Sequence, residues 1–316
     1  MAIEARELSK SFRINSKLPI PMSPSSKKAG QEGVSIERKV FDRISFTLDN
    51  GISCVVGPNG SGKTTLIRVL STDIPPDSGS CTVMSYDLVK EKNHVRSIIS
   101  TMFQGGSYFF DNQLTVGENI AFLSEVLELD KGKIRELMEV MRVNDYIGFK
   151  FGFLSHGNKK KMALIRAIAL DRPVLLLDEP TSDLDFAARM AVRKILQDIG
   201  EKKTILITTH EIEDIELCKK LLILYDAALK EYDRESILKL ANNFKVISIE
   251  KPNDNLGLEG CVLLSKSREQ IRILVSNQEV EELIRRLQGY TQLVVGKPNI
   301  SDIVIYISRL NNRSNW

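Results

Sequence analysis

The sequence predicts an α/β protein built on a doubly wound parallel sheet, and three observations support this fold class. A glycine-rich turn at residues 57–65 lies between an apolar run at 52–56 and a helix-like segment at 66–70. Two more runs, 173–178 and 203–208, have the continuous Val, Ile and Leu composition of buried parallel strands. The first of them ends in acidic residues, which at such strand ends face the ligand crevice of an α/β sheet.

An antiparallel unit is expected before the glycine-rich turn. Residues 4–12 predict a first strand, and residues 40–48 predict its hairpin partner because apolar side chains alternate along them. Between these strands, residues 15–38 contain three prolines and a cluster of Ser and Lys. We predict a mobile insertion there, with a docking or regulatory loop as the alternative.

A mostly helical lobe is predicted in the middle of the chain. Residues 97–103 form a buried strand that ends at Gln104. Helix periodicity follows at 116–129 and 133–146, so we place the lobe at about residues 105–165.

The pattern changes near residue 240, which we predict as the end of a nucleotide-binding domain, 1–240. Short strands at 221–225 and 229–232 and a helix at 234–240 precede it. Residues 241–316 then predict a small α+β domain without a catalytic constellation. Its expected elements are strands 244–249, 261–264, 271–275 and 293–295, a helix that starts with a Ser276–Glu279 capping box and ends at Gly289, and a helix at 299–310.

Composition describes an ordinary globular protein, with 42% apolar and 27% charged residues. The net charge of +3 is too small to indicate nucleic-acid binding. No apolar run reaches the length of about 18 residues that crosses a bilayer, so a membrane role requires another chain. Four cysteines that are far apart in the sequence, and a polar N-terminus, favour a reducing compartment.

The glycine-rich turn has the composition of a phosphate-binding loop. Its glycines let backbone N–H groups point at a triphosphate, Lys63 supplies charge to the β- and γ-oxygens, and the Thr64 hydroxyl can ligate Mg²⁺. A hairpin turn is the alternative, but it needs no buried lysine. The predicted nucleotide ligands are Gly57, Pro58, Asn59, Gly60, Ser61, Gly62, Lys63, Thr64 and Thr65.

Polar residues at three predicted strand ends complete a candidate catalytic site. Asp178 is placed to hold Mg²⁺, and the adjacent Glu179 can polarise a water for in-line attack on the γ-phosphate. His210 can hydrogen-bond the γ-phosphate or that water, and Gln104 can reach the metal or the water. The alternatives are an acidic surface turn, a structural histidine and a polar strand end.

Residues 154–158, Leu-Ser-His-Gly-Asn, precede three lysines and an apolar helix. Ser155 and Gly157 offer a hydroxyl and backbone N–H groups to an anion, and an ordinary helix N-cap is the alternative. We interpret the lysines at 159–161 as a solvated helix face rather than as ligands.

From about residue 4 to residue 239, this order of motifs resembles the ATP-binding cassette (ABC) ATPases. The resemblance implies a P-loop, RecA-like core with an antiparallel β subdomain and a helical lobe, and ATP and Mg²⁺ as cofactors. For the nucleotide, it assigns Walker A to 57–65, Walker B to 174–178 with catalytic Glu179, and adenine stacking to Phe12. It also assigns the glutamine loop to Gln104, the signature to 154–158, the aspartate loop to 182–185 with Asp185, and the switch to His210. For Phe12, a place in the hairpin core is the alternative.

The signature departs from the family's usual Leu-Ser-Gly-Gly-Gln, because His156 and Asn158 replace a glycine and the glutamine. Ser155 and Gly157, which in the family meet the γ-phosphate of the opposite subunit, are retained. The resemblance therefore implies two cassettes that close head to tail around two ATP molecules. A single phosphate loop also leaves one side of the triphosphate without donors, which a second copy can supply.

Transport is the leading functional hypothesis: an ATPase subunit on the cytoplasmic face of a membrane that drives a separate permease. Residues 298–303 resemble the C-terminal motif of drug and antibiotic-resistance exporters. Aromatic residues at 108–110 follow the glutamine loop, where the family receives a permease helix; burial in the lobe is the alternative. Other hypotheses are a translation or DNA-repair ATPase, and an ATP-binding scaffold, which the intact Lys63, Asp178, Glu179 and His210 disfavour.

Overall fold

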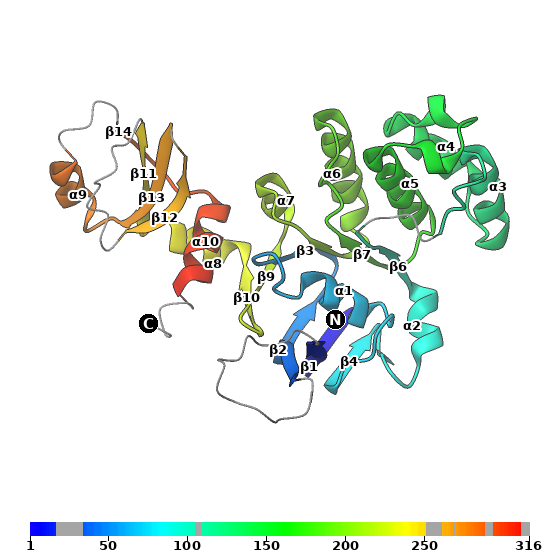
Figure 1. Cartoon of the computed structure of the whole chain (residues 1–316), viewed down its shortest axis with the longest axis horizontal. Helices are drawn as coiled ribbons and strands as arrows, with labels where there is room; N and C mark the ends of the chain where they lie inside the picture. The colour runs from blue at the N-terminus through cyan, green and yellow to red at the C-terminus, as the bar shows by residue number, and fades with distance from the viewer. Residues whose placement is uncertain (17–33, 105–108, 251–260, 268, 288–292, 311–316) are drawn as a thin grey trace, which may run out of the picture.

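A computed structural model of the chain describes residues 1–316 except 17–33, 105–108, 251–260, 268, 288–292 and 311–316. The described residues form one six-stranded sheet and two four-stranded sheets. In Figure 1 the six-stranded sheet lies at the centre, with one four-stranded sheet below it and the other at the left.

The central sheet has the strand order β10-β9-β3-β8-β7-β6. Its strands are β3 (Gly51–Val56), β6 (Ile99–Met102), β7 (Val174–Asp178), β8 (Thr204–Thr208), β9 (Lys220–Tyr225) and β10 (Ala228–Asp233). All pairs are parallel except β9 with β10. Because β3, β7 and β8 are buried along their whole length, they carry the continuous apolar runs that predicted them.

Two hydrophobic clusters cover the faces of the central sheet. Along β3, Cys54 and Val56 belong to one cluster and Val55 to the other, as the alternation of a strand requires. Helices α5 (His156–Ala169) and α6 (Phe186–Gly200) pack on the first face, and α1 (Lys63–Leu70) packs on the second (Figure 1). The sheet is therefore doubly wound, which confirms the predicted fold class.

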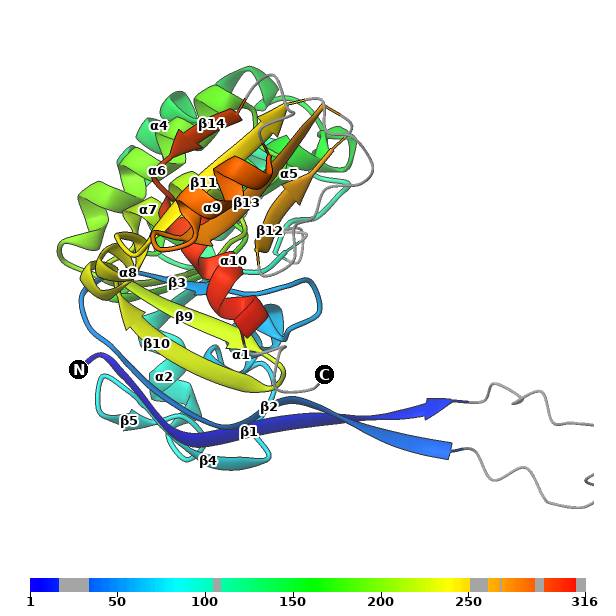
Figure 2. The same ribbon diagram turned by 90° about the vertical axis from the view of Figure 1, so that its left-hand side faces the viewer.

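The N-terminal sheet has the order β2-β1-β4-β5, with β1 (Ile3–Ser16), β2 (Val34–Leu48), β4 (Ser78–Val83) and β5 (Tyr86–Asp87). Strands β1 and β2 form a longer hairpin than predicted, and Figure 2 shows its far end extending away from the molecule. The predicted insertion at 15–38 was wrong at both ends, because the ladder continues to Ser16 and Val34. The remainder of it, 17–33, lies outside the described residues.

The segment between β5 and β7 is mainly helical. Besides strand β6, its elements are α2 (Lys92–Ile98), α3 (Val116–Val126), α4 (Lys131–Val140), short 3₁₀ turns at Asn144–Tyr146 and Phe151–Phe153, and α5. The helix expected at 133–146 ends at Val140, because the chain turns through a left-handed Arg142 with φ 54°. The strand expected at 97–103 is shorter, because Ser97 and Ile98 end helix α2.

The C-terminal sheet has the order β12-β13-β11-β14, with β11 (Phe244–Glu250), β12 (Val262–Lys266), β13 (Gln270–Ser276) and β14 (Leu293–Gly296). Helices α8 (Arg234–Ala241), α9 (Val280–Arg286) and α10 (Ile300–Leu310) accompany it. The Ser276 hydroxyl donates to Glu279 at 2.7 Å, but Ser276 is still in β13 and the helix begins at Val280, so the predicted capping box was wrong. Gly289 lies outside the described residues.

Helix α10 returns from the C-terminal sheet to the central sheet. Its Ile303 and Ile307 are buried in the same cluster as Ile215 of α7 (Ile212–Leu217) and Ile223 of β9. Helix α10 is also bound to the C-terminal sheet, because Arg272 of β13 donates to both carboxylate oxygens of the buried Asp302, at 3.0 and 3.1 Å. We retain the domain division after residue 240 as a proposal.

Cys54 and Cys218 form a disulfide with Cα atoms 5.9 Å apart. The chain after α7 runs beside β3, where the Lys219 N–H donates to the Ile52 carbonyl at 2.9 Å. The two cysteines are 164 residues apart in the sequence, so their spacing did not indicate this pair; Cys81 and Cys261 are free. Within the described ranges, no helix is long and apolar enough to cross a membrane.

Candidate nucleotide-binding site

A cavity of about 510 Å³ opens between the phosphate loop and the β1–β2 hairpin. Most predicted site residues from the same chain meet there. Its lining residues are Phe12, Arg38, Val40, Asn59, Gly60, Gly62, Lys63, Thr64, Thr65, Gln104, Glu179 and His210. Sequence reasoning missed Arg38 and Val40. The predicted ligands of the same chain that do not line this cavity are Gly57, Pro58, Ser61, Asp178 and Asp185. Ser155 and Gly157, expected at the nucleotide of an opposite subunit, do not line it either.

The loop at residues 57–65 depends on glycine at two positions where it approaches neighbouring chain. A Cβ at Gly57 would lie 2.1 Å from the Leu224 carbonyl oxygen, which is backbone and cannot move aside. Gly62 has φ 105°, and a Cβ there would lie 2.3 Å from Val40 Cγ1. The loop can therefore pass under the hairpin and turn into α1 only with these glycines.

Lys63 is the first residue of α1 and is buried. Its ammonium donates to the carbonyl oxygens of Gly57 at 2.9 Å and Pro58 at 3.1 Å, so it is held across the mouth of the loop. Burial lowers the pKa of Lys63, while the carboxylates of Glu179 and Asp178 oppose that shift. The site thus holds a poorly hydrated cation where a phosphate would meet it.

Asp178, the last residue of β7, is 1% exposed. Its Oδ1 accepts from the Thr208 hydroxyl at 2.5 Å, but its buried Oδ2 has no hydrogen-bond partner among the described residues. A buried carboxylate oxygen without a donor fits a cation or its water shell, and Mg²⁺ prefers such ligands. Around the described part of the site no cluster of three or more His, Cys, Asp or Glu forms a metal cage, as is usual for Mg²⁺ bound partly by phosphates.

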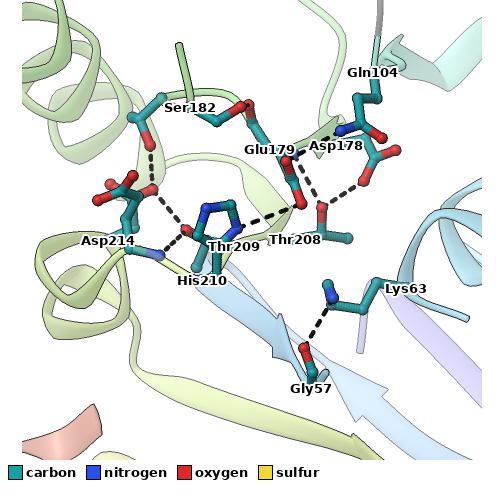
Figure 3. A network of polar contacts seen from close by, with 12 residues as sticks. Gly57, Lys63, Gln104, Asp178, Glu179, Ser182, Thr208, Thr209, His210 and Asp214 are labelled. Carbon is teal, nitrogen blue, oxygen red and sulfur yellow. Dashed lines mark hydrogen bonds and ion pairs between the residues drawn. The ribbon is translucent and has the colours of Figure 1, made fainter. Parts of the chain in front are cut away.

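Glu179 is fixed in a strained backbone conformation with φ 50°. Its N–H donates to the Thr208 hydroxyl at 2.9 Å, which binds the end of β7 to the end of β8. The carboxylate accepts from Gln104 Nε2 at 3.2 Å and lies 3.4 Å from His210 Nδ1 (Figure 3). The structure therefore brings Gln104, Glu179 and His210 together at the cavity, opposite Lys63.

A buried network supports these residues from behind. Asp214 of α7, 1% exposed, accepts from Thr209 at 2.9 Å, from Arg193 Nε at 2.7 Å and from Thr181. Thr181 lies two residues after Glu179, and Thr209 directly precedes His210, so Asp214 positions both segments. Figure 3 shows its contact with Thr209.

Replacing Arg193 with methionine is expected to destabilise the protein by about 3–5 kcal/mol, because it leaves the Asp214 carboxylate buried without its cation. Urea unfolding followed by circular dichroism would measure the loss. Lys194→Met, at the exposed neighbouring position, should change the free energy of unfolding by less than about 0.5 kcal/mol. Equal stability of the two variants would contradict a supporting role for this ion pair.

The signature residues are placed outside the cavity of their own chain. The Ser155 hydroxyl caps α5 by accepting from the Asn158 N–H at 3.3 Å, and the side chain is exposed. A Cβ at Gly157 would lie 3.1 Å from the Asp183 carbonyl oxygen, so the helix start packs closely on the aspartate loop. His156 Nε2 lies 3.8 Å from Asp183 Oδ2, on the same surface.

The interpretation of residues 159–161 as a solvated face was wrong for two of the three lysines. Lys160 is buried and donates to the Ser182 carbonyl oxygen at 2.7 Å, and this burial lowers its pKa. Lys161, also buried, contacts Asp185 at 3.0 Å. Asp185 itself caps α6 by accepting from the Ala188 N–H at 2.8 Å. These lysines therefore bind the start of α5 to the aspartate loop.

The aromatic residues at 108–110 are divided between surface and core. Phe109 is 44% exposed under Arg166, whose guanidinium carbon lies 3.6 Å from the ring centre. Phe110 is buried and stacks on Phe151 with ring centres 4.6 Å apart. Tyr108 lies outside the described residues; of the other two aromatic residues, Phe109 is exposed, as expected of a partner site, and Phe110 is buried in the lobe.

Comparison with known proteins identifies the family. Residues 41–182 match the family model described as ABC transporter. The chain is 31% identical over 202 residues to the ABC transporter ATP-binding protein NatA of Bacillus subtilis, a match that spans 62% of this chain and 81% of that protein. The chain belongs to the ABC transporter family. As an ABC ATPase, it binds ATP with Mg²⁺ and hydrolyses it.

Other similarities extend this identification. The chain is 29% identical over 290 residues to the Nod factor export ATP-binding protein I of Burkholderia lata, a match that spans 86% of this chain and 93% of that protein. Relatives named for import and for export both match. The solved structure of an ATP binding subunit of an ABC transporter has the same fold, with a TM-score of 0.61 and 18% identity over 77% of this chain and 94% of that one.

Proposed function

We propose that this chain is the motor subunit of an ABC exporter, and that two copies, or one copy and a related subunit, close head to tail on ATP. The observation that carries the proposal is that Ser155 is exposed and Gly157 is half-buried at the start of α5, and that neither lines the cavity that contains Lys63 and Glu179. Phosphoryl transfer needs donors around the whole γ-phosphate. Donors from a second chain complete the site.

Within the site we assign Glu179 as the residue that polarises the attacking water. His210 contacts Glu179 and the γ-phosphate end of the cavity, and Gln104 links the carboxylate to the helical lobe. Asp178 Oδ2 and the Thr64 hydroxyl are the proposed Mg²⁺ ligands, with Gln104 close to them. When bound, Mg²⁺ neutralises charge on the β- and γ-oxygens. Phe12, which lines the cavity from strand β1, receives the base.

Exposed apolar side chains on the helical lobe support a permease partner. Phe122 and Val126 of α3 are 58% and 59% exposed, and Phe149 and Phe153 are 56% and 82% exposed. Large exposed apolar side chains that lie close together on a surface are typical of a protein interface. We propose that a membrane permease covers it and holds the chain at the cytoplasmic face.

Export is the proposed direction of transport, with import as the alternative. The match to the Nod factor export protein spans 86% of the chain, and so extends well into the C-terminal sheet. Residues 298–303, which resemble the exporter motif, span the start of helix α10 at Ile300. No nucleic-acid partner is proposed.

Replacing the exposed Ser155 with arginine tests the two-chain site. The variant is expected to lower kcat about 10²- to 10³-fold, because it removes one donor from the opposite γ-phosphate and obstructs closure. Its affinity for ATP should stay the same, because Ser155 does not line its own chain's cavity. Light scattering with a non-hydrolysable ATP analogue should show a dimer for the wild type and a monomer for the variant.

Ser265→Arg is the matched control, because Ser265 is exposed on β12 of the C-terminal sheet. It should retain the nucleotide-dependent dimer and the wild-type kcat. A Ser155→Arg variant that dimerises and hydrolyses ATP at the wild-type rate would overturn the head-to-tail arrangement.

A further inference from the structure

Arg38 lines the nucleotide cavity from a segment that the sequence predicted as an insertion. In the β1–β2 hairpin it is the direct cross-strand partner of Phe12. Residues directly opposite each other on antiparallel strands have their side chains on the same face. The aromatic ring and the guanidinium group are therefore presented together to the cavity.

The guanidinium group also reaches the phosphate loop. Arg38 Nη2 donates to the Gly60 carbonyl oxygen at 3.0 Å. Arg38 thus reaches from its position opposite Phe12, the proposed base contact, to the turn of the loop, where Gly60 has φ 77°. The part of a nucleotide that lies between its base and its β-phosphate is the ribose and the α-phosphate.

Among the residues that line the cavity, Arg38 and Lys63 carry a positively charged Arg or Lys side chain. Lys63 is buried at the loop and bound to the Gly57 and Pro58 carbonyl oxygens. Arg38 is exposed, and within the described part of the chain it forms no ion pair with a carboxylate. A guanidinium group remains charged at every physiological pH and binds phosphate through several N–H donors. Its charge is therefore available to a ligand.

We propose that Arg38 is a nucleotide-binding residue whose guanidinium group contacts the α-phosphate. This assignment rests on the proposed site, in which Phe12 holds the base and Lys63 the β- and γ-phosphates. The contact with Gly60 keeps the side chain extended over the loop before the nucleotide arrives, so little side-chain entropy is lost on binding. The hairpin then contributes both a base contact and a phosphate contact from one cross-strand pair.

A purely structural role for Arg38, as a brace on the Gly60 carbonyl, makes a different prediction. A brace needs a hydrogen-bond donor, whereas a phosphate contact needs the charge. Arg38→Gln retains an N–H donor and removes the charge, Arg38→Lys retains the charge on a single ammonium, and Arg38→Ala removes both. Lys39→Ala is the control, because Lys39 is the exposed neighbour on β2, pairs with Asp42 at 2.8 Å and does not line the cavity.

Calorimetric titration of the full chain with MgADP measures the contact without hydrolysis. We expect Arg38→Ala and Arg38→Gln to raise the Kd about 10- to 100-fold, as for the loss of a charged hydrogen bond. Arg38→Lys should be intermediate, and Lys39→Ala should match the wild type. Adenosine, measured by competition, should bind all variants equally, because it has no phosphate. The difference between wild type and Arg38→Gln should decrease with added salt.

Wild-type MgADP affinity in Arg38→Gln would overturn the proposal, whether or not Arg38→Ala binds weakly, because a neutral donor would then suffice. An equal loss of ADP and adenosine affinity would also overturn it, because the contact would be with the nucleoside. The Lys63→Ala variant distinguishes a failure of the Arg38 assignment from a failure of the proposed nucleotide site. If Lys63→Ala loses ADP and Arg38→Gln does not, only the assignment of Arg38 fails; if both bind as the wild type, the nucleotide site itself is wrong.

Discussion

Glu179→Gln is expected to lower the rate of ATP hydrolysis about 10²- to 10⁴-fold while leaving ATP affinity close to that of the wild type. The amide has the shape of the carboxylate but cannot take a proton from water. The backbone of residue 179 is held by the Thr208 hydroxyl at 2.9 Å, which does not depend on the side chain. The substitution therefore removes the chemistry of the group without moving the segment that carries it.

Phosphate release at saturating ATP measures the rate, and equilibrium binding of ATP measures the affinity. The ATP-dependent dimer should persist for longer in Glu179→Gln, because its nucleotide is not consumed. Glu201→Gln, at the exposed C-cap of α6, is the control and should hydrolyse ATP at the wild-type rate. Wild-type turnover of Glu179→Gln would show that another group activates the water.

Lys63→Ala is expected to weaken ATP binding about 10- to 100-fold and to lower kcat by a further factor of about 10²–10³. The first effect is the loss of a charged donor to the phosphates. The second arises because charge on the γ-oxygens grows in the transition state, where a poorly hydrated cation is most effective. The variant also leaves the Gly57 and Pro58 carbonyl oxygens without the donor that holds them together.

ATP titration and phosphate release at several ATP concentrations separate the two effects of Lys63→Ala. Lys63→Arg should not restore activity, because a planar fork cannot replace a compact ammonium in this buried position. Lys239→Ala, on the exposed side of α8, should behave as the wild type. If Lys63→Ala hydrolyses ATP as the wild type does, the loop at 57–65 is not the site of the reaction.

The core of the central sheet could be predicted from the sequence because strands β3, β7 and β8 are buried on both faces. Continuous apolar runs such as 174–177 give a signal that does not depend on the rest of the fold. The polar residues that follow them, Asp178, Glu179 and His210, were predicted together for the same reason, because parallel strands end at one edge of the sheet. Their chemical roles remain predictions.

Features that depend on pairing between distant segments could not be predicted. Arg38 is a polar residue in a polar stretch, and only its register with Phe12 places it at the cavity. Lys160 was interpreted as solvated because a lysine normally is, and its burial results from the packing of α5 on Ser182. The short helix α9 begins later than its capping-box sequence indicates, because strand β13 continues through Ser276.

Helix α10 has a consequence for how the molecule unfolds. Its apolar face closes the cluster that contains Ile215 of α7, and α7 also carries Asp214, which accepts hydrogen bonds from Thr181 and Thr209. A chain ended at residue 240 would leave that face of α7 in contact with water. We therefore expect local opening of the last helix to loosen the segments next to Glu179 and His210, so that unfolding near the C-terminus and loss of order at the nucleotide site are coupled.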